Sequence, residues 1–299
     1  MAIVFTPFGD VKEEDFPSCA HFTKRKPADE ILNEFYELGR GKSKIARDTI
    51  KCELNISYGE SPREIIDVFY PSNVTEDTGM VIFFHGGYWQ EGCSQDYHFL
   101  AIPITSSGRI CILVGKDLAP QASLQESLNQ CRKSLSFISK KFWATSEIII
   151  FGHSAGGQEC TMLLSTDWKA YDAELAFYLK SKLKKVISIC GVYDLTQLIE
   201  THVNDVLNMS WKEAISVSPI AHIDQLYANL RSYDCEFIMI NVENDAPTIL
   251  KCSRIFEREM KLGAVPFRNF FLKDKDHFSV ILEMVDKNSV GIKVLLGED

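Results

Sequence analysis

Four stretches of this chain are apolar at nearly every position, and they restrict its fold more than any other feature. Their sequences are MVIFFH at 80–85, EIIIF at 147–151, KVISIC at 185–190 and FIMINV at 237–242. A strand with one face in water alternates apolar and polar residues. These stretches have no polar face, which is typical of buried strands in a parallel sheet. Because such a sheet needs helices on both faces, the sequence predicts an α/β fold with a mostly parallel central sheet.

Helical patterns alternate with short apolar runs beyond the N-terminal segment, which adds detail to this prediction. The strands are predicted at 52–57, 63–70, 80–85, 109–114, 146–151, 185–190, 236–242 and 267–272. One helix is expected to begin after Ser123, which forms an S-x-x-E capping box with Glu126, and another begins at Pro247. We expect a single domain over 1–299, in which a partly helical segment at 1–50 packs over the sheet as a flap or cap.

The balance of charges argues against a nucleic-acid or membrane partner. The chain has 299 residues with 41 acidic and 32 basic side chains, which gives a formal net charge of −9. This charge provides no overall attraction to nucleic acid or to anionic lipid. The expected ligand is therefore a small molecule, while the oligomeric state, including a homodimer, is left open.

Nine cysteines are scattered along the chain without any CxxC pair. Several lie inside apolar stretches, where a free thiol behaves as a small hydrophobic side chain, and their spacing does not match a metal finger. This usage is typical of a reducing compartment. The N-terminal apolar stretch spans four residues, too short for a signal peptide or a membrane span. We therefore expect a cytoplasmic protein, without separating the cytoplasm from the nucleus.

The segment GHSAGG directly follows the predicted strand at 146–151 and contains the motif G-x-S-x-G at 152–156. In this motif, glycines two places on either side of the serine let a strand and the next helix approach closely. The serine is held in a strained turn with its hydroxyl exposed above the sheet. A helical stretch, GGQECTMLLS, follows, so the motif has the context that it requires. We therefore predict Ser154 as a nucleophile, against the alternative of an ordinary glycine-rich turn.

A serine nucleophile needs a base, and the base needs an acid that orients it. On this kind of fold the three residues follow the chain order serine, acid, histidine. Asp245 follows the strand at 236–242, and His277 follows the last predicted strand. Both lie at carboxyl ends of strands, where open α/β sheets build their sites. We therefore predict Ser154, Asp245 and His277 as a catalytic triad.

Other residues compete for these two roles. Asp194 also follows a strand and is the alternative acid, although it could instead cap the next helix. Asp274 and Asp276 flank the histidine in sequence but are expected to face solvent. His153 is expected to point away as the variable residue of the motif, and His222 lies in a predicted loop. Either histidine is interpreted as a packed or hydrogen-bonded residue instead of a base.

The sequence HGGYW, after the strand at 80–85, is predicted to stabilise negative charge. Acyl transfer places that charge on the carbonyl oxygen, and each fixed donor near this oxygen contributes roughly 3 to 4 kcal/mol. Gly86 and Gly87 lie in the loop that supplies one half of such an oxyanion hole, and the N–H of Ala155 supplies the other half. We interpret His85 as a brace for this loop.

Two aromatic residues stand where a third glycine is often found, since esterases with an HGGG motif have glycine at the place of Tyr88. In one interpretation, Tyr88 and Trp89 form a wall of the pocket for a flat aromatic group, because rings favour stacked or edge contacts. In the other, both pack inside the loop and contact no ligand. The sequence does not separate these interpretations.

Taken together, HGGYWQ, GHSAGG, NDAP and DHFSVI resemble the kynurenine formamidases, or arylformamidases, which are α/β-hydrolases of tryptophan catabolism. The resemblance covers roughly residues 20–295 in order and spacing, and HGGYW is its specific part. It implies hydrolysis of N-formyl-L-kynurenine, an aromatic formamide, to L-kynurenine and formate, with no cofactor and no metal. It also implies that Tyr193, after the strand at 185–190, contributes to the pocket, although core packing explains this residue equally well.

Three alternative functions differ in the residues that each of them requires. A broad-specificity carboxylesterase or arylesterase would use the same triad. A hydrolase fold kept only for protein binding would have lost the serine, the histidine or a glycine of the hole, and none is missing. A metal-dependent amidase would need a cluster of His, Asp or Glu ligands, whereas HGGYW supplies one histidine without neighbouring ligands.

Overall fold

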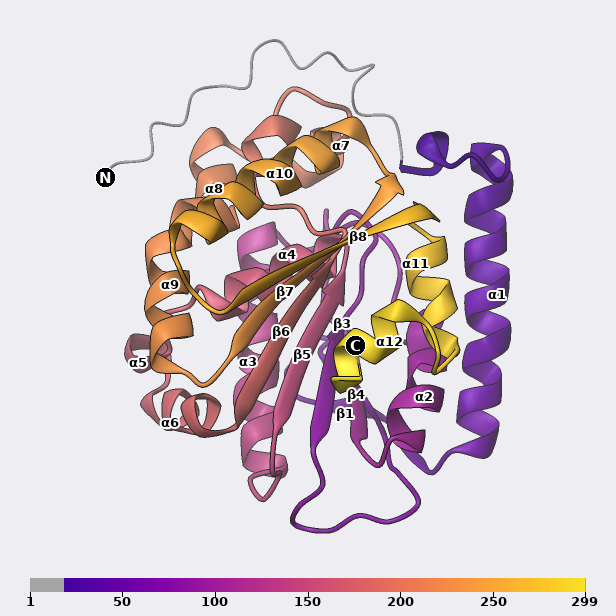
Figure 1. The fold of residues 1–299 in the computed structure, drawn as a ribbon, viewed down its shortest axis with the longest axis vertical. Helices are drawn as coiled ribbons and strands as arrows, with labels where there is room; N and C mark the ends of the chain where they lie inside the picture. The colour runs from indigo at the N-terminus through magenta and orange to yellow at the C-terminus, as the bar shows by residue number, and fades with distance from the viewer. Residues whose placement is uncertain (1–18, 299) are drawn as a thin grey trace.

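The central sheet has eight strands in the order β1-β2-β4-β3-β5-β6-β7-β8 (Figure 1). The structure is a computed structural model that describes residues 19–298, so part of the segment predicted as a flap, 1–18, lies outside the described residues. The strands are β1 Cys52–Ser57, β2 Ile65–Phe69, β3 Met80–Phe84, β4 Ile110–Val114, β5 Ile148–His153, β6 Leu183–Ile189, β7 Glu236–Asn244 and β8 Phe267–Asp276. Each of them overlaps a predicted strand.

Most of the sheet is parallel, as predicted. Strand β2 pairs antiparallel with β1 and β4, and every other neighbouring pair is parallel. The central strands β3, β4 and β5 are buried at every residue. This burial explains why these segments carry no alternating polar face.

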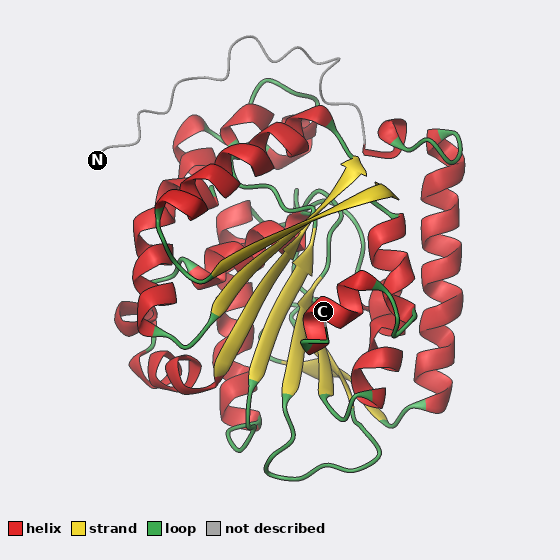
Figure 2. Ribbon diagram, viewed as in Figure 1, coloured by secondary structure: helices red, strands yellow, loops and turns green. Residues whose placement is uncertain are grey.

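Helices cover both faces of the sheet (Figure 2). They are α1 Ala28–Thr49, α2 Ala101–Ser106, α3 Leu124–Lys141, α4 Ala155–Leu164, α5 Trp168–Tyr171, α6 Ala173–Lys182, α7 Val203–Leu207, α8 Trp211–Ser216, α9 Ile223–Ser232, α10 Pro247–Leu262, α11 Ser279–Leu282 and α12 Val290–Leu296. Short 3-10 helices are η2 Cys19–Phe22, η3 Ser94–Leu100, η4 Thr196–Leu198, η5 Pro219–His222 and η6 Glu283–Val285. Apolar residues of α3, α6 and α9 pack on one face, and those of α1, α2 and α12 on the other.

Both predicted helix starts are confirmed. The Ser123 side chain accepts a hydrogen bond from the Glu126 N–H, and the Glu126 carboxylate accepts one from the Ser123 N–H. Helix α10 begins with Pro247 at its first position. Within the predicted flap, the long helix α1 buries Ile31 and Phe35 and packs beside η3 and α11.

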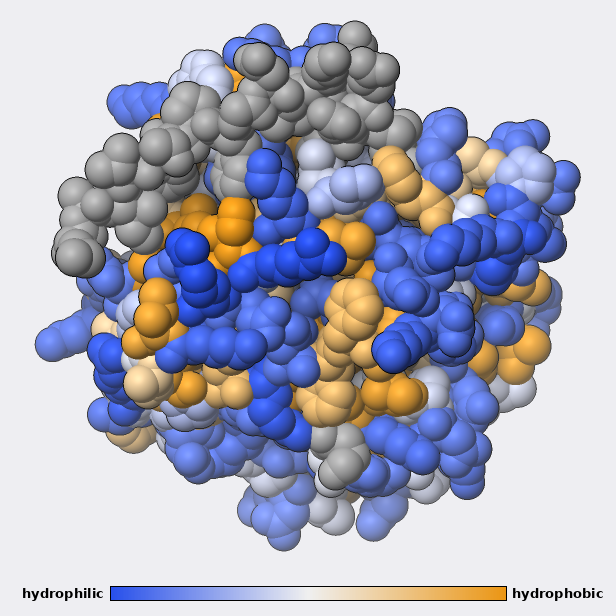
Figure 3. Space-filling model, turned by 45° about the horizontal axis from the view of Figure 1, so that its top comes forward, coloured by the Kyte–Doolittle hydropathy of each residue, from blue (hydrophilic) through white to orange (hydrophobic). Residues whose placement is uncertain are grey.

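A helix that crosses a membrane must be both long and apolar. The face in Figure 3 is mostly hydrophilic, with apolar residues in separate areas. Across residues 19–298, none of the helices combines the length and hydropathy that crossing a bilayer requires.

The turn between β5 and α4 brings backbone against backbone. A Cβ atom added at Gly152 would lie 2.0 Å from the Gly156 carbonyl oxygen, and one added at Gly156 would lie 2.0 Å from the Phe84 carbonyl oxygen. Both glycines of the motif are therefore required by close contact. The first turn of α4 is pressed against the end of β3 as a result.

We predict that Gly156→Ala destabilises the fold by about 3 kcal/mol or more, because backbone atoms must move to admit the methyl group. Chemical denaturation monitored by circular dichroism measures this change. The matched control is Gly41→Ala in α1, where an added Cβ meets nothing within 4 Å. This control should gain up to about 1 kcal/mol from helix propensity. Equal stability of the Gly156 variant and the wild type would contradict the close contact.

Candidate active site

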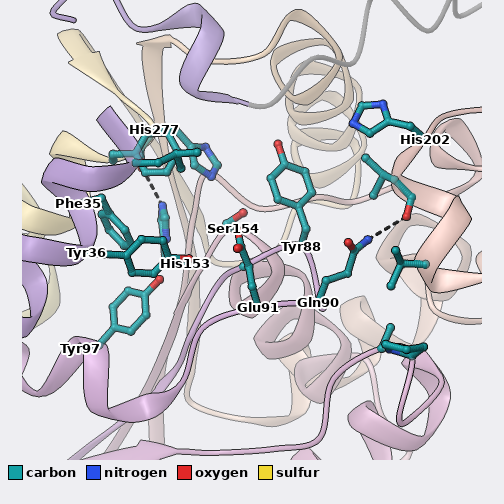
Figure 4. A pocket seen from close by; sticks show the side chains of 17 residues that line it. Phe35, Tyr36, Tyr88, Gln90, Glu91, Tyr97, His153, Ser154, His202 and His277 are labelled. Carbon is teal, nitrogen blue, oxygen red and sulfur yellow. Dashed lines mark hydrogen bonds between the residues drawn. The ribbon is translucent and has the colours of Figure 1, made fainter. Parts of the chain in front are cut away.

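A cavity of about 450 Å³ opens where the central strands end at their carboxyl edges. Ser154 and His277 both line it, together with residues of the loop after β3 (Figure 4). Aromatic side chains supply much of the remaining wall: Phe35, Tyr36, Tyr88, Tyr97 and Phe278. The cavity is thus apolar over most of its surface, with a few polar groups that converge in it, as is typical of small-molecule sites.

Ser154 lies in a backbone conformation that L-residues rarely adopt, with φ 56° and ψ −118°. Its N–H donates to the Ile189 carbonyl oxygen at 2.8 Å, which ties the turn to the end of β6. The packing of the flanking glycines holds the turn on its other side. Strain of this kind persists only where the surrounding structure fixes it, and it is common at functional sites.

Asp245 and His277 form a buried pair at the ends of β7 and β8. The His277 Nδ1 lies 3.0 Å from Oδ1 and 2.9 Å from Oδ2 of Asp245. Both residues are almost inaccessible to solvent. With Nδ1 turned to the carboxylate, Nε2 is the ring nitrogen left for another partner, which is the orientation that a general base requires.

Each residue of this pair shifts the pKa of the other. Burial favours the neutral imidazole, but interactions with the Asp245 carboxylate and, after it, with Cys19 outweigh burial and raise the pKa of His277 well above 6.5. Burial opposes ionisation of Asp245 as well, yet the nearby His277 lowers the pKa of this carboxyl. The pair therefore stabilises an imidazolium beside a carboxylate.

The structure brings Ser154 and His277 into one cavity without joining them directly. Among the described residues, the Ser154 hydroxyl has no hydrogen bond to His277, although the sequence prediction implies such a contact. Hydrogen bonds of an unliganded site are often long and shorten when substrate is bound. A hydroxyl, an imidazole and a carboxylate placed in this order can activate an oxygen nucleophile.

The residues predicted for the oxyanion hole lie together beside Ser154. A Cβ added at Gly86 would lie 3.0 Å from the Ser154 Cβ, and Gly87 has a φ of 121° and lines the cavity. Ala155 begins α4 directly after Ser154. Within residues 19–298, no group accepts a hydrogen bond from the N–H of Gly87 or Ala155. Both N–H groups are therefore without an internal acceptor, and that of Gly87 belongs to a residue that lines the cavity.

A buried ion pair braces this loop from behind. Lys116 Nζ lies 3.0 Å from a Glu159 carboxylate oxygen, and both side chains are almost fully buried. The same ammonium donates to the His85 carbonyl oxygen at 3.2 Å. His85 Nδ1 lies 2.8 Å from the Gly86 carbonyl oxygen, which confirms the expected bracing role. Burial and then the charge of Lys116 lower the pKa of His85 well below its usual value, so the ring is neutral.

The structure separates the two aromatic residues of HGGYW. Tyr88 and Trp89 both have left-handed backbones, with φ of 50° and 58°. Tyr88 lines the cavity, whereas Trp89 is buried, packs in the core and donates from Nε1 to Gln158 Oε1 at 3.0 Å. The wall interpretation therefore fits Tyr88, and the packed interpretation fits Trp89.

Two further predictions are settled by position. Tyr193 lies in the core, where its hydroxyl donates to Ser188 Oγ at 2.9 Å and its ring stacks on Phe256 at 4.2 Å. It is not among the residues that line the cavity, so we correct its placement at the substrate. The Asp194 carboxylate accepts the Thr196 N–H at 3.0 Å, which fits the capping role.

The other candidates for the base and the acid have different environments. His153 does not point away as expected, because its ring lies 4.8 Å from that of His277 and its Nε2 lies 2.8 Å from the His277 carbonyl oxygen. Burial and the charge of His277 lower the pKa of His153 to about 3, so this ring is a weak base. His222 Nε2 lies 2.8 Å from the Ser216 carbonyl oxygen. Asp274 is exposed, as expected.

Asp276 is buried, which contradicts the expectation that it faces solvent. Its carboxylate forms an ion pair with Arg25 and accepts the N–H groups of Phe278 and Ser279. These contacts fix the turn that follows His277. The sequence around DKDHF shows alternating charges and gives no signal of this burial.

Cys19 is a site residue that the sequence did not indicate. It is buried beside the predicted triad, with its N–H 3.1 Å and its Sγ 3.0 Å from the Tyr88 hydroxyl. Three side chains that could each offer a ligand atom to a metal ion lie together here: those of Cys19, Asp245 and His277. Their ligand atoms lie within 4.8 Å of one another, and residues 19–298 contain no other group of this kind. Two nitrogen or oxygen ligands of a tetrahedral ion lie about 3.3 Å apart. The 2.9 Å contact of Asp245 with His277 is a direct hydrogen bond instead.

Comparisons with known proteins identify relatives that match most of this chain. The BD-FAE family model matches residues 66–245. A kynurenine formamidase of Danio rerio is 30% identical over 279 residues, 93% of this chain and 92% of that protein. A kynurenine formamidase of Drosophila melanogaster is 25% identical over 287 residues, with 92% of each chain covered.

Solved structures add evidence for the fold. A thioesterase candidate from Silicibacter sp. tm1040 has a TM-score of 0.78 and 21% identity, with 94% of this chain and 97% of that chain covered. An esterase from Pyrobaculum calidifontis has a TM-score of 0.66 and 16% identity, with 92% and 91% covered. The sheet order, the strained serine and the buried acid–histidine pair define the class, which is that of the α/β-hydrolases. Within this class, the near full-length match at 30% identity shows that the chain belongs to the kynurenine formamidase family.

We predict that Asp245→Asn lowers the pKa of His277, because the amide cannot supply the charge that stabilises the imidazolium. NMR titration of the His277 ring measures this shift. In the wild type the neutral base appears only as the pH rises through this raised pKa, so kcat/KM should increase over the same range. Asp194→Asn is the matched control and should leave the titration in place. An unchanged midpoint in the Asp245 variant would contradict the assigned pair.

Proposed function

We propose that this protein hydrolyses the formamide bond of N-formyl-L-kynurenine, releasing L-kynurenine and formate. The observation that carries the proposal is the buried Asp245–His277 pair, whose histidine lines one cavity with a strained Ser154 in a member of the kynurenine formamidase family. We assign Ser154 as the nucleophile, His277 as the base and acid, and Asp245 as the residue that orients His277.

In the first half-reaction, Ser154 Oγ attacks the formyl carbon while His277 Nε2 takes the hydroxyl proton. The carbonyl oxygen becomes negatively charged, and the N–H groups of Gly87 and Ala155 donate to it. The carbon–nitrogen bond then breaks, and the imidazolium of His277 protonates the departing nitrogen. Because an anilide nitrogen shares its lone pair with the ring, the amine leaves more readily than an alkyl amine.

In the second half-reaction, water replaces the amine. His277 Nε2 takes a proton from this water, whose oxygen attacks the formyl ester on Ser154. Collapse of the second tetrahedral species returns the proton to Ser154 Oγ and releases formic acid, which loses its remaining acidic proton to solvent and becomes formate. The protein supplies every group used in this sequence, so the proposal requires no cofactor and no metal.

Specificity must come from the leaving group, because formyl is the smallest acyl group. The cavity of about 450 Å³ is much larger than a formyl group. The rings of Tyr36, Tyr88 and Tyr97 line it, and aromatic surfaces favour stacked or edge contacts with an aryl leaving group. This wall favours aryl formamides over small aliphatic ones.

The second candidate is a broad carboxylesterase that uses the same three residues. Solved esterases share the fold at 14–17% sequence identity, which supports the fold alone, and the same three residues could serve either reaction. The two functions differ in rate ratios. We predict a higher kcat/KM for N-formyl-L-kynurenine than for p-nitrophenyl acetate in the purified protein. A far higher value for the ester would overturn the formamidase proposal.

Replacing Ser154 by alanine should lower kcat by about 10⁴-fold or more while the protein remains folded, because the nucleophile is lost. Single-turnover assays of kynurenine release measure this loss, and circular dichroism checks the fold. Ser127→Ala is the matched control, since it removes a buried hydroxyl that has no hydrogen-bond partner in the described chain. Comparable rates in the Ser154 variant and the control would remove Ser154 from the mechanism.

We assign the protein to the cytoplasm because all nine cysteines are free and most of them are buried. Its partner is a small aromatic molecule, in line with the net charge of −9, which gives no attraction to nucleic acid. A homodimer stays compatible with this function, because one chain supplies the whole proposed triad.

A further inference from the structure

The charged groups of the cavity are unequally distributed. Among the described residues that line it, Glu91 carries the one carboxylate, and no lysine or arginine is present. Besides His153 and His277, which contact each other, His202 is the remaining basic side chain of the lining. The cavity is therefore suited to a cationic group of a ligand and offers little to an anionic one.

The backbone of Glu91 is held by a tight turn in the loop after β3, and the side chain of Glu91 is exposed. Its N–H donates to the Gly87 carbonyl oxygen at 2.9 Å, in the same tight turn that carries Tyr88. A Cβ added at Gly87 would lie 3.3 Å from the Glu91 Cγ, so the two residues are in contact. Figure 4 shows the Glu91 side chain rising from this loop into the cavity below Ser154.

The neighbours of Glu91 leave its charge unpaired. Tyr36 of α1 interacts with it, and burial, followed by the charges of Glu91 and Asp96, raises the pKa of Tyr36. This hydroxyl is therefore neutral and can donate to the carboxylate. The nearest arginine on the same helix, Arg40, instead pairs with Asp96 at 3.2 Å. Within residues 19–298, no lysine or arginine forms an ion pair with Glu91.

We propose that Glu91 binds the α-ammonium group of the substrate and thereby determines specificity for the leaving group. This inference rests on the proposed function, since it concerns the same cavity. An ammonium donates up to three hydrogen bonds and pairs with a carboxylate, whereas a substrate carboxylate near Glu91 would be repelled. The substrate class is then aryl formamides whose side chain carries a cationic amine. The carboxylate of an amino-acid head group contributes less.

Three substrates separate these contributions. N-formyl-L-kynurenine carries both head-group charges, 4-(2-formamidophenyl)-4-oxobutanoate lacks the amine but keeps the carboxylate, and formanilide lacks the whole side chain. In the wild type, we expect kcat/KM for N-formyl-L-kynurenine to exceed that for the analogue without the amine by about tenfold or more, as for loss of a charged hydrogen bond. The difference should lie mainly in KM, because the contact forms in the ground state as well.

Glu91→Gln should reduce this ratio to near one, and Glu91→Asp, which keeps the charge, should restore part of it. The matched control is Glu76→Gln, which removes the same charge from an exposed residue in the loop before β3. This loop lies at the amino ends of the strands, whereas the cavity lies at their carboxyl ends. This control should keep the wild-type ratio. It thus separates the local contact from a general change in electrostatic potential.

Two results would overturn the inference. Glu91→Gln could retain the wild-type ratio, or it could slow the substrates with and without the amine by the same factor. In either case the formamidase proposal stands, because N-formyl-L-kynurenine is still hydrolysed by the wild type. If the wild type hydrolyses neither N-formyl-L-kynurenine nor formanilide, the proposed function fails and the inference fails with it.

Discussion

The contact of backbone with backbone at the end of β5 is the constraint on which the rest of the site depends. Gly156 lies so close to the Phe84 carbonyl oxygen that no side chain fits between them. This contact presses the first turn of α4 against the loop that follows β3. As a consequence, the strained Ser154 and Gly87 line the cavity together, and Gly86 and Ala155 lie directly beside Ser154. A looser contact between α4 and the loop after β3 would let these groups separate.

Buried charges also stabilise the contact between α4 and the loop after β3. Lys116 contacts both the His85 carbonyl oxygen and Glu159 of α4, so one ammonium connects the loop with the helix. Burial raises the pKa of Glu159 to about 7 despite the pairing with Lys116. Removing one member of such a pair leaves an uncompensated charge in the interior, and this typically costs about 3 to 5 kcal/mol. The Asp245–His277 pair uses the same low-dielectric interior for a different purpose, because it holds the imidazole in one orientation.

The sheet could be predicted almost completely from the sequence, because each buried strand is a continuous apolar run, and two helix starts could be predicted from the local signals at Ser123 and Pro247. The acid and the base could be predicted from chain order and from their places after strands. The distance between Asp245 and His277 could not be predicted from the sequence, because it depends on how β7 and β8 end. Local patterns also failed where contacts are distant in sequence. Trp89 turns inward to Gln158, Asp276 is buried by Arg25, and Cys19 reaches Tyr88 from the N-terminal segment.

The central claim is spatial, because it joins a serine, a histidine and two backbone amides around one tetrahedral carbon. A crystal structure of the protein inactivated by an aryl phosphonate, whose phosphorus mimics that carbon, tests it most directly. The account predicts a covalent bond from Ser154 Oγ to phosphorus, with the phosphoryl oxygen about 2.7 to 3.1 Å from the N–H groups of Gly87 and Ala155. It also predicts His277 Nε2 within hydrogen-bond distance of the adduct. An adduct on another residue, or a phosphoryl oxygen turned away from both amides, would contradict it.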